Sequence, residues 1–307
     1  MNDPHDIIES LLPNNLNGKN LFHYTSQDGL IGIVNKKQIW CSHIFYLNDI
    51  EENLNGWKIF FDVLKKYKAT ENKASSFRQE IQNYARVHSE IDFDNLENRD
   101  MKKLRIDQYN LFVFSLSREE DDLSQWRSYT PESRGFCIHF KFDETFIKEQ
   151  KTFLNGDPND NSSASNCQIL LRECIYKPLT KEVAMTRLLD YYFQQFANQT
   201  QSWAQELYLR IHFLSLFFKN EKFEHEKECR LVVRVHDQCK ELIKIKPGKT
   251  FLVPYIELDT IPNSIKGITI GPSPFPYHSE AALKTLIRNS GLDINMSINR
   301  SNVPYRP

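Results

Sequence analysis

The sequence has little glycine and no excess of charge of either sign. Only 10 of its 307 residues are glycine, about half the usual share of roughly 7%. It contains no GxGxxG and no GxSxG motif, so nothing indicates a nucleotide site built on a glycine-rich loop. The 39 Lys and Arg residues against 40 Asp and Glu residues give a net charge of −1. This balance argues against broad binding of duplex nucleic acid.

Metal-binding cysteine motifs and long apolar stretches are also missing. The six cysteines form no CxxC pair and match no zinc-ligand spacing, so we expect free, mostly buried thiols and no metal. The longest apolar stretch lies near Phe213–Phe218, far short of the ~20 residues of a transmembrane helix. The N-terminal residues are acidic and polar and do not resemble a secretory signal. We therefore expect a cytoplasmic protein with no membrane partner.

The residues that are present predict an ordered α+β protein. A hydrophobic share of 40% is enough for a real core. Short apolar strands alternate with helical segments, which indicates central mixed, largely antiparallel sheets with inserted and peripheral helices. Ser26 is a predicted N-cap for a helix over about 27–35. We expect a single domain over residues 1–307, with a helical insertion at about 51–105 and a helical pair at about 180–219.

Polar side chains lie where three predicted strands begin or end. They are His23, Tyr24 and Thr25 at the end of the first strand, Ser115 and Ser117 at the end of a middle strand, and Glu226 and Glu228 where a later strand opens. Sheet proteins commonly place binding and catalytic groups at such positions. On a strand the two carboxylates would share one face, and their repulsion would raise the pKa of one unless a cation or a ligand hydroxyl lies between them. An edge strand with solvated charges gives the same pattern.

Two further segments have both an ordinary and a functional interpretation. Asn48 and Asp49, with Glu52, either cap the helix that follows and complement its dipole or belong to a site. Trp126 and Tyr129 are three residues apart and share a helical face. That pair either packs in the core or provides aromatic rings for a ligand.

Together these segments resemble a bacterial family of unassigned activity, catalogued as domain of unknown function 2971. The resemblance runs from about residue 20 to the C-terminus. It depends on short motifs: His23-Tyr24-Thr25-Ser26, Leu47-Asn48-Asp49 with Glu52, Phe114-Ser115-Leu116-Ser117, Trp126 with Tyr129, Phe218-Lys219 followed by Glu226-Lys227-Glu228-Cys229-Arg230, Gly271-Pro272, and the terminal Ser301-x-x-Pro304-Tyr305-Arg306.

The order of the motifs is also similar, more distantly, to that of the ADP-ribosyltransferase superfamily, which includes bacterial toxins. That resemblance implies a split sheet, no need for GxGxxG, and NAD as the substrate. It places the His23-Tyr24-Thr25 segment on the NAD ribose, Ser115 or Ser117 in the nicotinamide pocket, and the rings of Trp126 and Tyr129 against the nicotinamide. Glu228 matches the catalytic glutamate and Glu226 the acid that orients the acceptor. Arg230 would keep these carboxylates ionised.

Three functions remain open at this point. The first is an ADP-ribosyltransferase-like enzyme that modifies a protein or nucleic-acid acceptor, as a toxin or phage-defence effector. The second is a non-catalytic sensor that binds a nucleotide or a partner. The third is a metal-dependent nuclease using Asp49, Glu52, Glu226 and Glu228. The acceptor and the oligomeric state stay open, but the first function requires His23, Ser115 and Glu228 to converge at one cleft.

Overall fold

The computed structural model describes residues 4–46, 50–68, 72–89, 110–130, 134–155, 167–198, 203–235, 237–248, 250–260 and 264–304. Its contacts group the chain into two compact units. A helical unit is formed by Met1–Asn14, Ile44–Tyr109 and Cys174–Glu224, and a sheet unit by Asn15–His43, Asn110–Glu173 and His225–Pro307. Each unit therefore comes from three separate stretches of sequence. The single-domain expectation stays a prediction.

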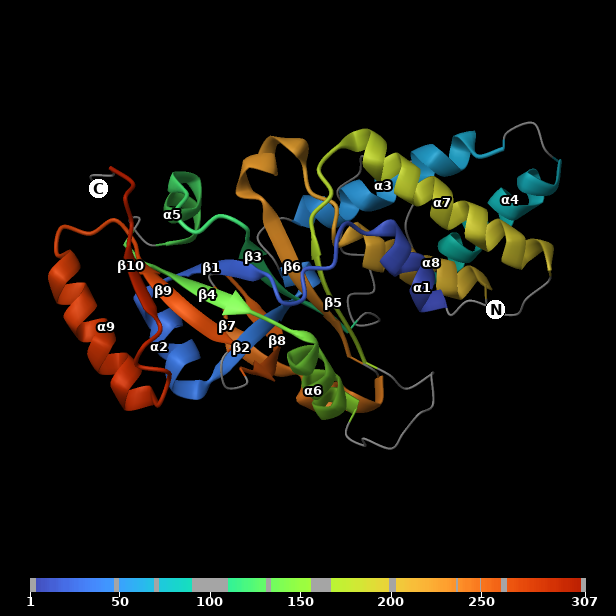
Figure 1. Cartoon of the computed structure of the whole chain (residues 1–307). Helices are drawn as coiled ribbons and strands as arrows, with labels where there is room; N and C mark the ends of the chain where they lie inside the picture. The colour runs from blue at the N-terminus through green and yellow to red at the C-terminus, as the bar shows by residue number, and fades with distance from the viewer. Residues whose placement is uncertain are drawn as a thin grey trace. The chain divides into compact units, whose positions relative to one another are not determined.

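The helical unit contains both predicted helical segments (Figure 1). Its helices are α1 (Pro4–Leu11), α3 (Ile50–Lys66), α4 (Asn72–Ser89), α7 (Pro178–Ala197) and α8 (Trp203–Ser215). The short 3-10 helix η1 (Ile44–Tyr46) comes just before α3. Helix α3 packs against α7 and α8. Trp57 of α3 is buried there beside Tyr208 and His212. The part of the predicted insertion after Ser89 lies outside the described residues.

Within the described residues, the sheet unit contains ten strands and four α-helices. The strands are β1 (Asn20–Thr25), β2 (Gln38–His43), β3 (Leu111–Ser117), β4 (Phe136–Lys141), β5 (Gln168–Glu173), β6 (Glu228–Arg234), β7 (Lys244–Pro247), β8 (Leu252–Asp259), β9 (Ile265–Ile270) and β10 (Ser297–Arg300). The helices are α2 (Gln27–Lys36), α5 (Leu123–Tyr129), α6 (Glu144–Asn155) and α9 (Pro276–Ser290). Two 3-10 helices, η5 (Glu221–Glu226) and η6 (Asp237–Leu242), flank β6. Helix α6 had no counterpart in the sequence-based expectations.

The sheet is mixed but mostly antiparallel. Its main path runs β10-β9-β4-β1-β3-β2-β8-β7, with β6 on β3 and β5 on β6. Only the β9–β10 pair is parallel, and the other strand pairs described are antiparallel. The α+β class and the mixed, largely antiparallel sheet are therefore confirmed.

The two faces of the sheet have different coverings because side chains alternate along each strand. One face carries the hydrophobic core, to which β1 contributes Leu21 and β3 contributes Phe112 and Phe114. Helices α2, α6 and α9 bury apolar side chains in the same core. On the opposite face α5 places Trp126 against Tyr24 and Cys137. The polar alternate residues of β3 and β6 face this second side.

Strand β3 changes neighbours along one of its edges. Its N-terminal part pairs with β2 through Ser42↔Val113 and His43↔Phe112, whereas its last residue pairs with β1 through Phe22↔Ser117. Among the described residues, the middle of this edge has no ladder partner. The sheet is therefore split between β1 and β2, next to Ser115.

The end of β1 is fixed by the start of α2. Ser26 is the N-cap, and its side-chain oxygen accepts a hydrogen bond from the Gly29 amide at 3.1 Å, which confirms the predicted cap. A Cβ at Gly29 would lie 2.0 Å from Oγ1 of Thr25. Glycine at this position therefore lets the first turn of α2 approach the strand end that carries His23.

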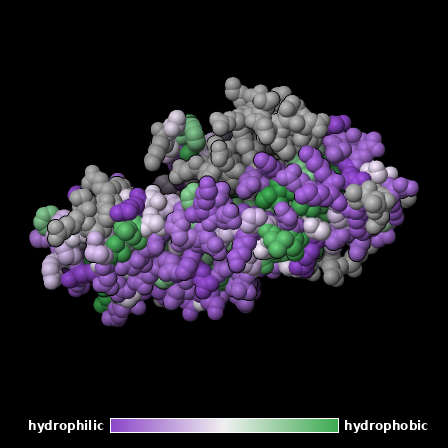
Figure 2. Space-filling model, turned by 90° about the horizontal axis from the view of Figure 1, so that it is seen from above, coloured by the Kyte–Doolittle hydropathy of each residue, from purple (hydrophilic) through white to green (hydrophobic). Residues whose placement is uncertain are grey.

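The surface seen in Figure 2 is mostly hydrophilic, with small and separate hydrophobic areas. Among the described residues, no helix combines the length and the apolar character needed to cross a membrane.

Candidate functional site

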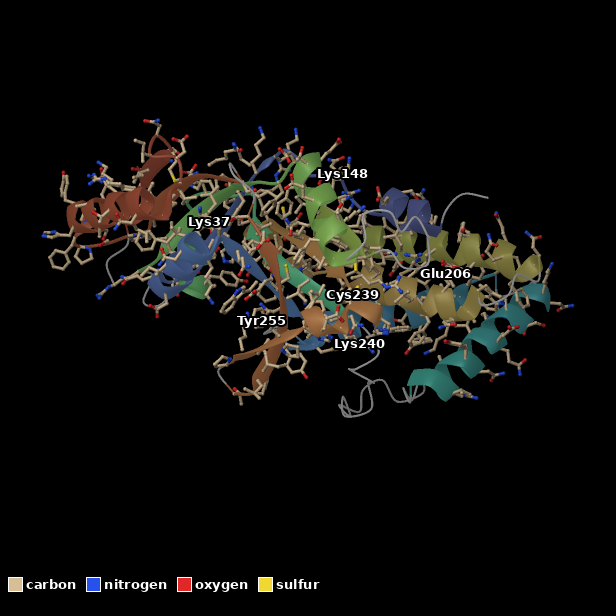
Figure 3. All side chains as sticks on the ribbon, turned by 90° about the horizontal axis from the view of Figure 1, so that it is seen from below. Lys37, Lys148, Glu206, Cys239, Lys240 and Tyr255 are labelled. Carbon is tan, nitrogen blue, oxygen red and sulfur yellow. The ribbon has the colours of Figure 1, made fainter. Side chains whose placement is uncertain are left out.

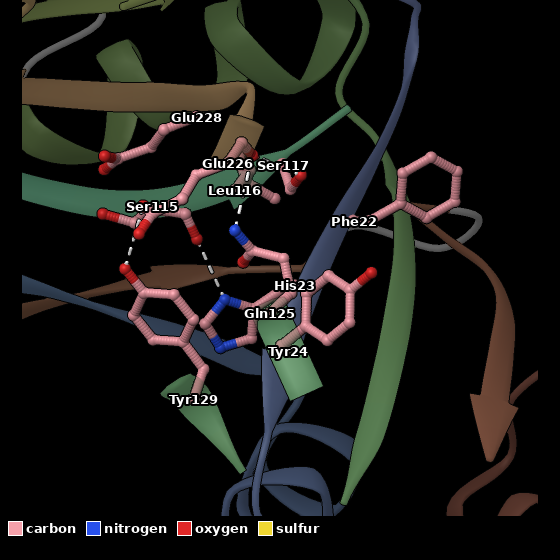
Figure 4. Close-up of a pocket in the computed structure, with 10 residues that line it drawn as sticks. All are labelled: Phe22, His23, Tyr24, Ser115, Leu116, Ser117, Gln125, Tyr129, Glu226 and Glu228. Atoms are coloured by element: carbon pink, nitrogen blue, oxygen red, sulfur yellow. Dashed lines mark hydrogen bonds between the residues drawn. The ribbon is translucent and has the colours of Figure 1, made fainter. Parts of the chain in front are cut away.

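A cavity lies at the split in the sheet, on the face that carries α5 (Figure 4). It has about 350 Å³ of empty space, including its open mouth. Ten residues line it: Phe22, His23, Tyr24, Ser115, Leu116, Ser117, Gln125, Tyr129, Glu226 and Glu228. All ten belong to the sheet unit. The expected convergence of His23, Ser115 and Glu228 is confirmed.

His23 occupies the split in its neutral form. Its Nδ1 lies 3.0 Å from the carbonyl oxygen of Ser115, on the edge of β3 that lacks a ladder partner. Its ring stacks on Phe114 with the ring centres 4.3 Å apart. Burial lowers the pKa of His23 to about 4, so the imidazole is uncharged at neutral pH. Because a carbonyl can only accept, Nδ1 carries the proton and Nε2 is left as a hydrogen-bond acceptor.

Tyr24 fastens the loop that leads from β3 to α5. Its hydroxyl donates to the carbonyl of Glu119 at 2.8 Å and accepts from the amide of Asp122 at 3.0 Å. Its ring meets the Trp126 ring edge-on at 4.7 Å. Burial raises the pKa of the Tyr24 hydroxyl, so it stays protonated. Tyr24 holds α5 over the cavity.

The two serines of the Ser-x-Ser motif make different contacts. Ser117 is 2% exposed, and its hydroxyl donates to the Glu226 carbonyl at 2.8 Å and accepts from the Glu119 amide at 3.1 Å. The Ser115 hydroxyl has no hydrogen-bond partner among the residues that the structure describes, and it faces the cavity. Ser117 therefore fixes the backbone around the site, while Ser115 offers a hydroxyl to a ligand.

A bidentate ion pair holds Glu228 at the start of β6. Nε of Arg230 lies 2.8 Å from Oε1, and Nη2 lies 3.1 Å from Oε2. Both side chains are buried, at 8% exposure for the glutamate and 5% for the arginine. Along the ladder Glu228 faces Ser117 and Arg230 faces Ser115. The carboxylate is thus fixed beside both serines.

Glu226 reaches the cavity by a different route from the predicted one. We expected Glu226 and Glu228 on one strand, but Glu226 ends η5 and β6 begins only at Glu228. Lys227 between them has a left-handed φ of 43°, which turns the chain. The hydroxyl of Tyr129 donates to Oε2 of Glu226 at 3.2 Å (Figure 4). Both carboxylates line the cavity because of this turn, not because of strand alternation.

Three predicted site residues lie behind the cavity wall. Thr25 is buried against Gly29. Trp126 is fully buried, and its Nε1 donates to Asp121 at 2.7 Å. Arg230 is buried and holds Glu228, which lines the cavity, through their ion pair.

No described residue of the predicted segment at Asn48, Asp49 and Glu52 lines the cavity. Asn48 and Asp49 lie outside the described residues. Glu52 belongs to α3 of the helical unit, and its side chain is outside the description. Within the described residues no group of three or more His, Cys, Asp or Glu side chains could hold a metal ion.

Three lining residues were not predicted as site residues from the sequence: Phe22, Leu116 and Gln125. Gln125 is 5% exposed, and its amide nitrogen lies 3.4 Å from the Glu226 carbonyl. The helical period contained the signal. Gln125 and Tyr129 are four residues apart and share a face, whereas Trp126 points from the same helix into the core.

A family model described as a protein of unknown function (DUF2971) matches residues 125–231. This segment is about a third of the chain. It contains the cavity residues Gln125, Tyr129, Glu226 and Glu228, together with Arg230. Comparisons with curated proteins and with solved structures give no significant match.

Proposed function

We propose that the protein is an ADP-ribosyltransferase-like enzyme that consumes NAD and modifies a macromolecular acceptor. The observation that carries the proposal is the convergence of His23, Ser115, Tyr129, Glu226 and Glu228 around one cavity at a split in the sheet. These residues come from motifs far apart in the sequence. Their meeting supports the order-of-motif resemblance, which requires a ribose-binding histidine, a serine and a glutamate at one place.

The charges and dipoles of the cavity fit glycosidic cleavage. When the bond between the ribose C1′ and the nicotinamide nitrogen of NAD breaks, the nicotinamide leaves with the electron pair and positive charge develops on the ribose. A carboxylate already fixed by Arg230 stabilises that charge without reorganising, and Glu228 is this carboxylate. The acceptor nucleophile bonds to C1′, and its proton passes to Glu226 as general base.

The remaining lining residues fit binding of the substrate. Tyr129 is 42% exposed, so a planar nicotinamide can stack on its ring. Nε2 of His23 and the hydroxyl of Ser115 suit the hydroxyls of a ribose or the carboxamide. Even with its open mouth the cavity has only about 350 Å³, so most of a dinucleotide would extend beyond it.

The direct test is transfer of label from NAD. The purified full chain is incubated with adenylate-labelled NAD and cell extract, and both nicotinamide release and labelled macromolecules are measured. We expect E228Q to lower turnover about 100-fold or more, the usual effect of removing a group that stabilises transition-state charge. E226Q should lower transfer to the acceptor more than it lowers hydrolysis of NAD, because water can replace the acceptor.

K227Q is the matched control, since Lys227 lies between the two glutamates but pairs with Glu119 at the surface. It should keep wild-type turnover. E228Q leaves the buried Arg230 without its charge partner, so circular dichroism must show that this variant is folded. Wild-type turnover in both folded glutamate variants would overturn the assigned roles. Nucleotide binding without product would favour the sensor function, and NAD-independent, chelator-sensitive cleavage of nucleic acid the nuclease.

A further inference from the structure

Lys246 of β7 is a half-buried cation without a carboxylate partner among the described residues. Its Nζ donates to the Ser42 hydroxyl at 2.8 Å. Two strand positions earlier, Lys244 is exposed and pairs with Glu257. The two lysines share a face of β7 but have opposite environments. A cation that is removed from water without a counter-ion is costly, so its retention points to an anion that the protein binds.

Aromatic rings hold Lys246 in place. Its Nζ lies 5.4 Å from the centre of the Trp40 ring and 5.5 Å from that of Tyr255. The centres of those two rings are 4.6 Å apart. Tyr255 is labelled on the β7–β8 pair in Figure 3. A second cation, Lys36, lies 4.9 Å from the centre of the Trp40 ring. This cation–aromatic cluster (Lys36, Trp40, Lys246 and Tyr255) fixes positive charge beside flat apolar surface.

The cluster lies on the same sheet face as the cavity. Ser42 of β2 pairs directly with Val113 of β3, and Val113 and Ser115 share a face because they are two residues apart. Trp40, Ser42 and Lys246 are therefore on the side of the sheet to which Ser115 points, across the split from β1. The positive charge of Lys246 also acts on His23, where it lowers the pKa of the imidazole in addition to the effect of burial.

We propose that Lys246 binds the diphosphate of a nucleotide whose ribose end occupies the cavity. This inference rests on the proposed function and extends it to the part of the substrate that the cavity cannot hold. A phosphate would supply the missing counter-ion, and charge-assisted hydrogen bonds to phosphate are among the stronger ones in proteins. Burial lowers the pKa of Lys246, and a bound anion would reverse that effect.

Calorimetric titration of the full chain tests the site with ADP-ribose, inorganic pyrophosphate and nicotinamide as probes. K246Q should weaken ADP-ribose and pyrophosphate about tenfold or more and leave nicotinamide binding unchanged. K246R keeps the charge and should retain most of the affinity. K244Q is the matched control on the same strand and face, and its affinities should equal those of the wild type. The ligand-free K246Q protein should not melt at a lower temperature, because it loses a cation that lacks a counter-ion.

The failure of this inference and that of the proposed function are distinguishable. If NAD is consumed and K246Q leaves both its KM and the ADP-ribose affinity unchanged, the diphosphate site is wrong and the enzyme assignment stands. If pyrophosphate and ADP-ribose bind through Lys246 but NAD is never consumed, the site stands and the enzyme assignment fails. Absence of binding of all phosphate probes to the wild type overturns the site. Tighter binding of a single-stranded oligonucleotide than of ADP-ribose, through Lys246, also overturns the site.

Discussion

Ser115 and Ser117 belong to one motif but differ in what their hydroxyls can do. The Ser117 hydroxyl satisfies the Glu226 carbonyl and the Glu119 amide, so the backbone beside the carboxylates depends on it. The Ser115 hydroxyl is directed at the cavity without a partner among the described residues. We therefore expect Ser117 to contribute to stability and Ser115 to contribute to ligand binding.

We expect S117A to lower the free energy of unfolding by about 1–2 kcal/mol, because it removes the two hydrogen bonds that the buried hydroxyl makes to the Glu226 carbonyl and the Glu119 amide. S115A should change stability by less than about 0.5 kcal/mol but weaken NAD binding by up to about tenfold through the lost hydrogen bond. Urea unfolding and calorimetric titration of both variants measure the two effects. Equal stability losses in the two variants would contradict this division.

The residues of the site were predictable where a chemical motif coincides with a strand end, as at His23 and Ser115. The way in which Glu226 reaches the cavity could not be predicted. It depends on the left-handed backbone at Lys227, which no feature of the sequence indicates. Trp126 shows the other limit. Its aromatic ring suited a ligand-binding role, but it packs on Tyr24 and donates a hydrogen bond to Asp121. Which side of α5 faces the core depends on the three-dimensional packing.

At the scale of elements, the apolar patterns of β3 and the N-cap of α2 predicted those elements closely. The split between β1 and β2 could not be predicted from the sequence, because it follows from which strands pair with β3. This pairing joins residues far apart in the sequence, such as Phe22 and Ser117. Close approaches between helices are equally invisible in the sequence. Gly56 of α3 is such a contact, since a Cβ there would lie 2.4 Å from Cβ and 3.1 Å from Cα of Ser215 in α8.

We expect G56A to lower the free energy of unfolding by about 1–2 kcal/mol, since overpacking of α3 against α8 outweighs the better helix propensity of alanine. G32A in α2 is the matched control, because nothing lies within 4 Å of a Cβ at that position. It should raise stability by about 0.5–1 kcal/mol. Thermal and urea unfolding measure both changes. If G56A is as stable as G32A, the two helices separate without cost and the contact is unimportant.

On the scale of the whole molecule, the two units alternate along the chain. The boundaries fall after residues 14, 43, 109, 173 and 224, so no single cut of the sequence separates one unit from the other. This interleaving explains why composition and linkers gave no sign of two units: no Pro- or Gly-rich linker marks these boundaries. Each unit nevertheless has its own buried aromatic residues and a histidine whose pKa is lowered by burial, His212 in the helical unit and His23 in the sheet unit.

Both histidines make the molecule sensitive to acid in the same direction. Burial lowers the pKa of His212 to about 3 and that of His23 to about 4, from 6.5 in the unfolded chain. Between these values and pH 6.5 the unfolded state binds more protons than the folded state, so stability falls as the pH falls. From pH 7 to pH 5 each histidine should remove about 2 kcal/mol from the free energy of unfolding.

Asparagine is the informative replacement at both positions, because its amide can donate to the Ser115 carbonyl in place of Nδ1 of His23. Its oxygen can also accept from the Trp57 indole, which lies 3.3 Å from Nδ1 of His212. H23N and H212N should each reduce the loss between pH 7 and pH 5 by about 2 kcal/mol. Since the residues belong to different units, their effects should add in the double variant. Burial also lowers the pKa of His139. The double variant should therefore keep some pH dependence, smaller than that of the wild type. Urea unfolding at pH 7, 6 and 5 measures the slopes, and a double variant with the wild-type slope would show that neither histidine is held neutral.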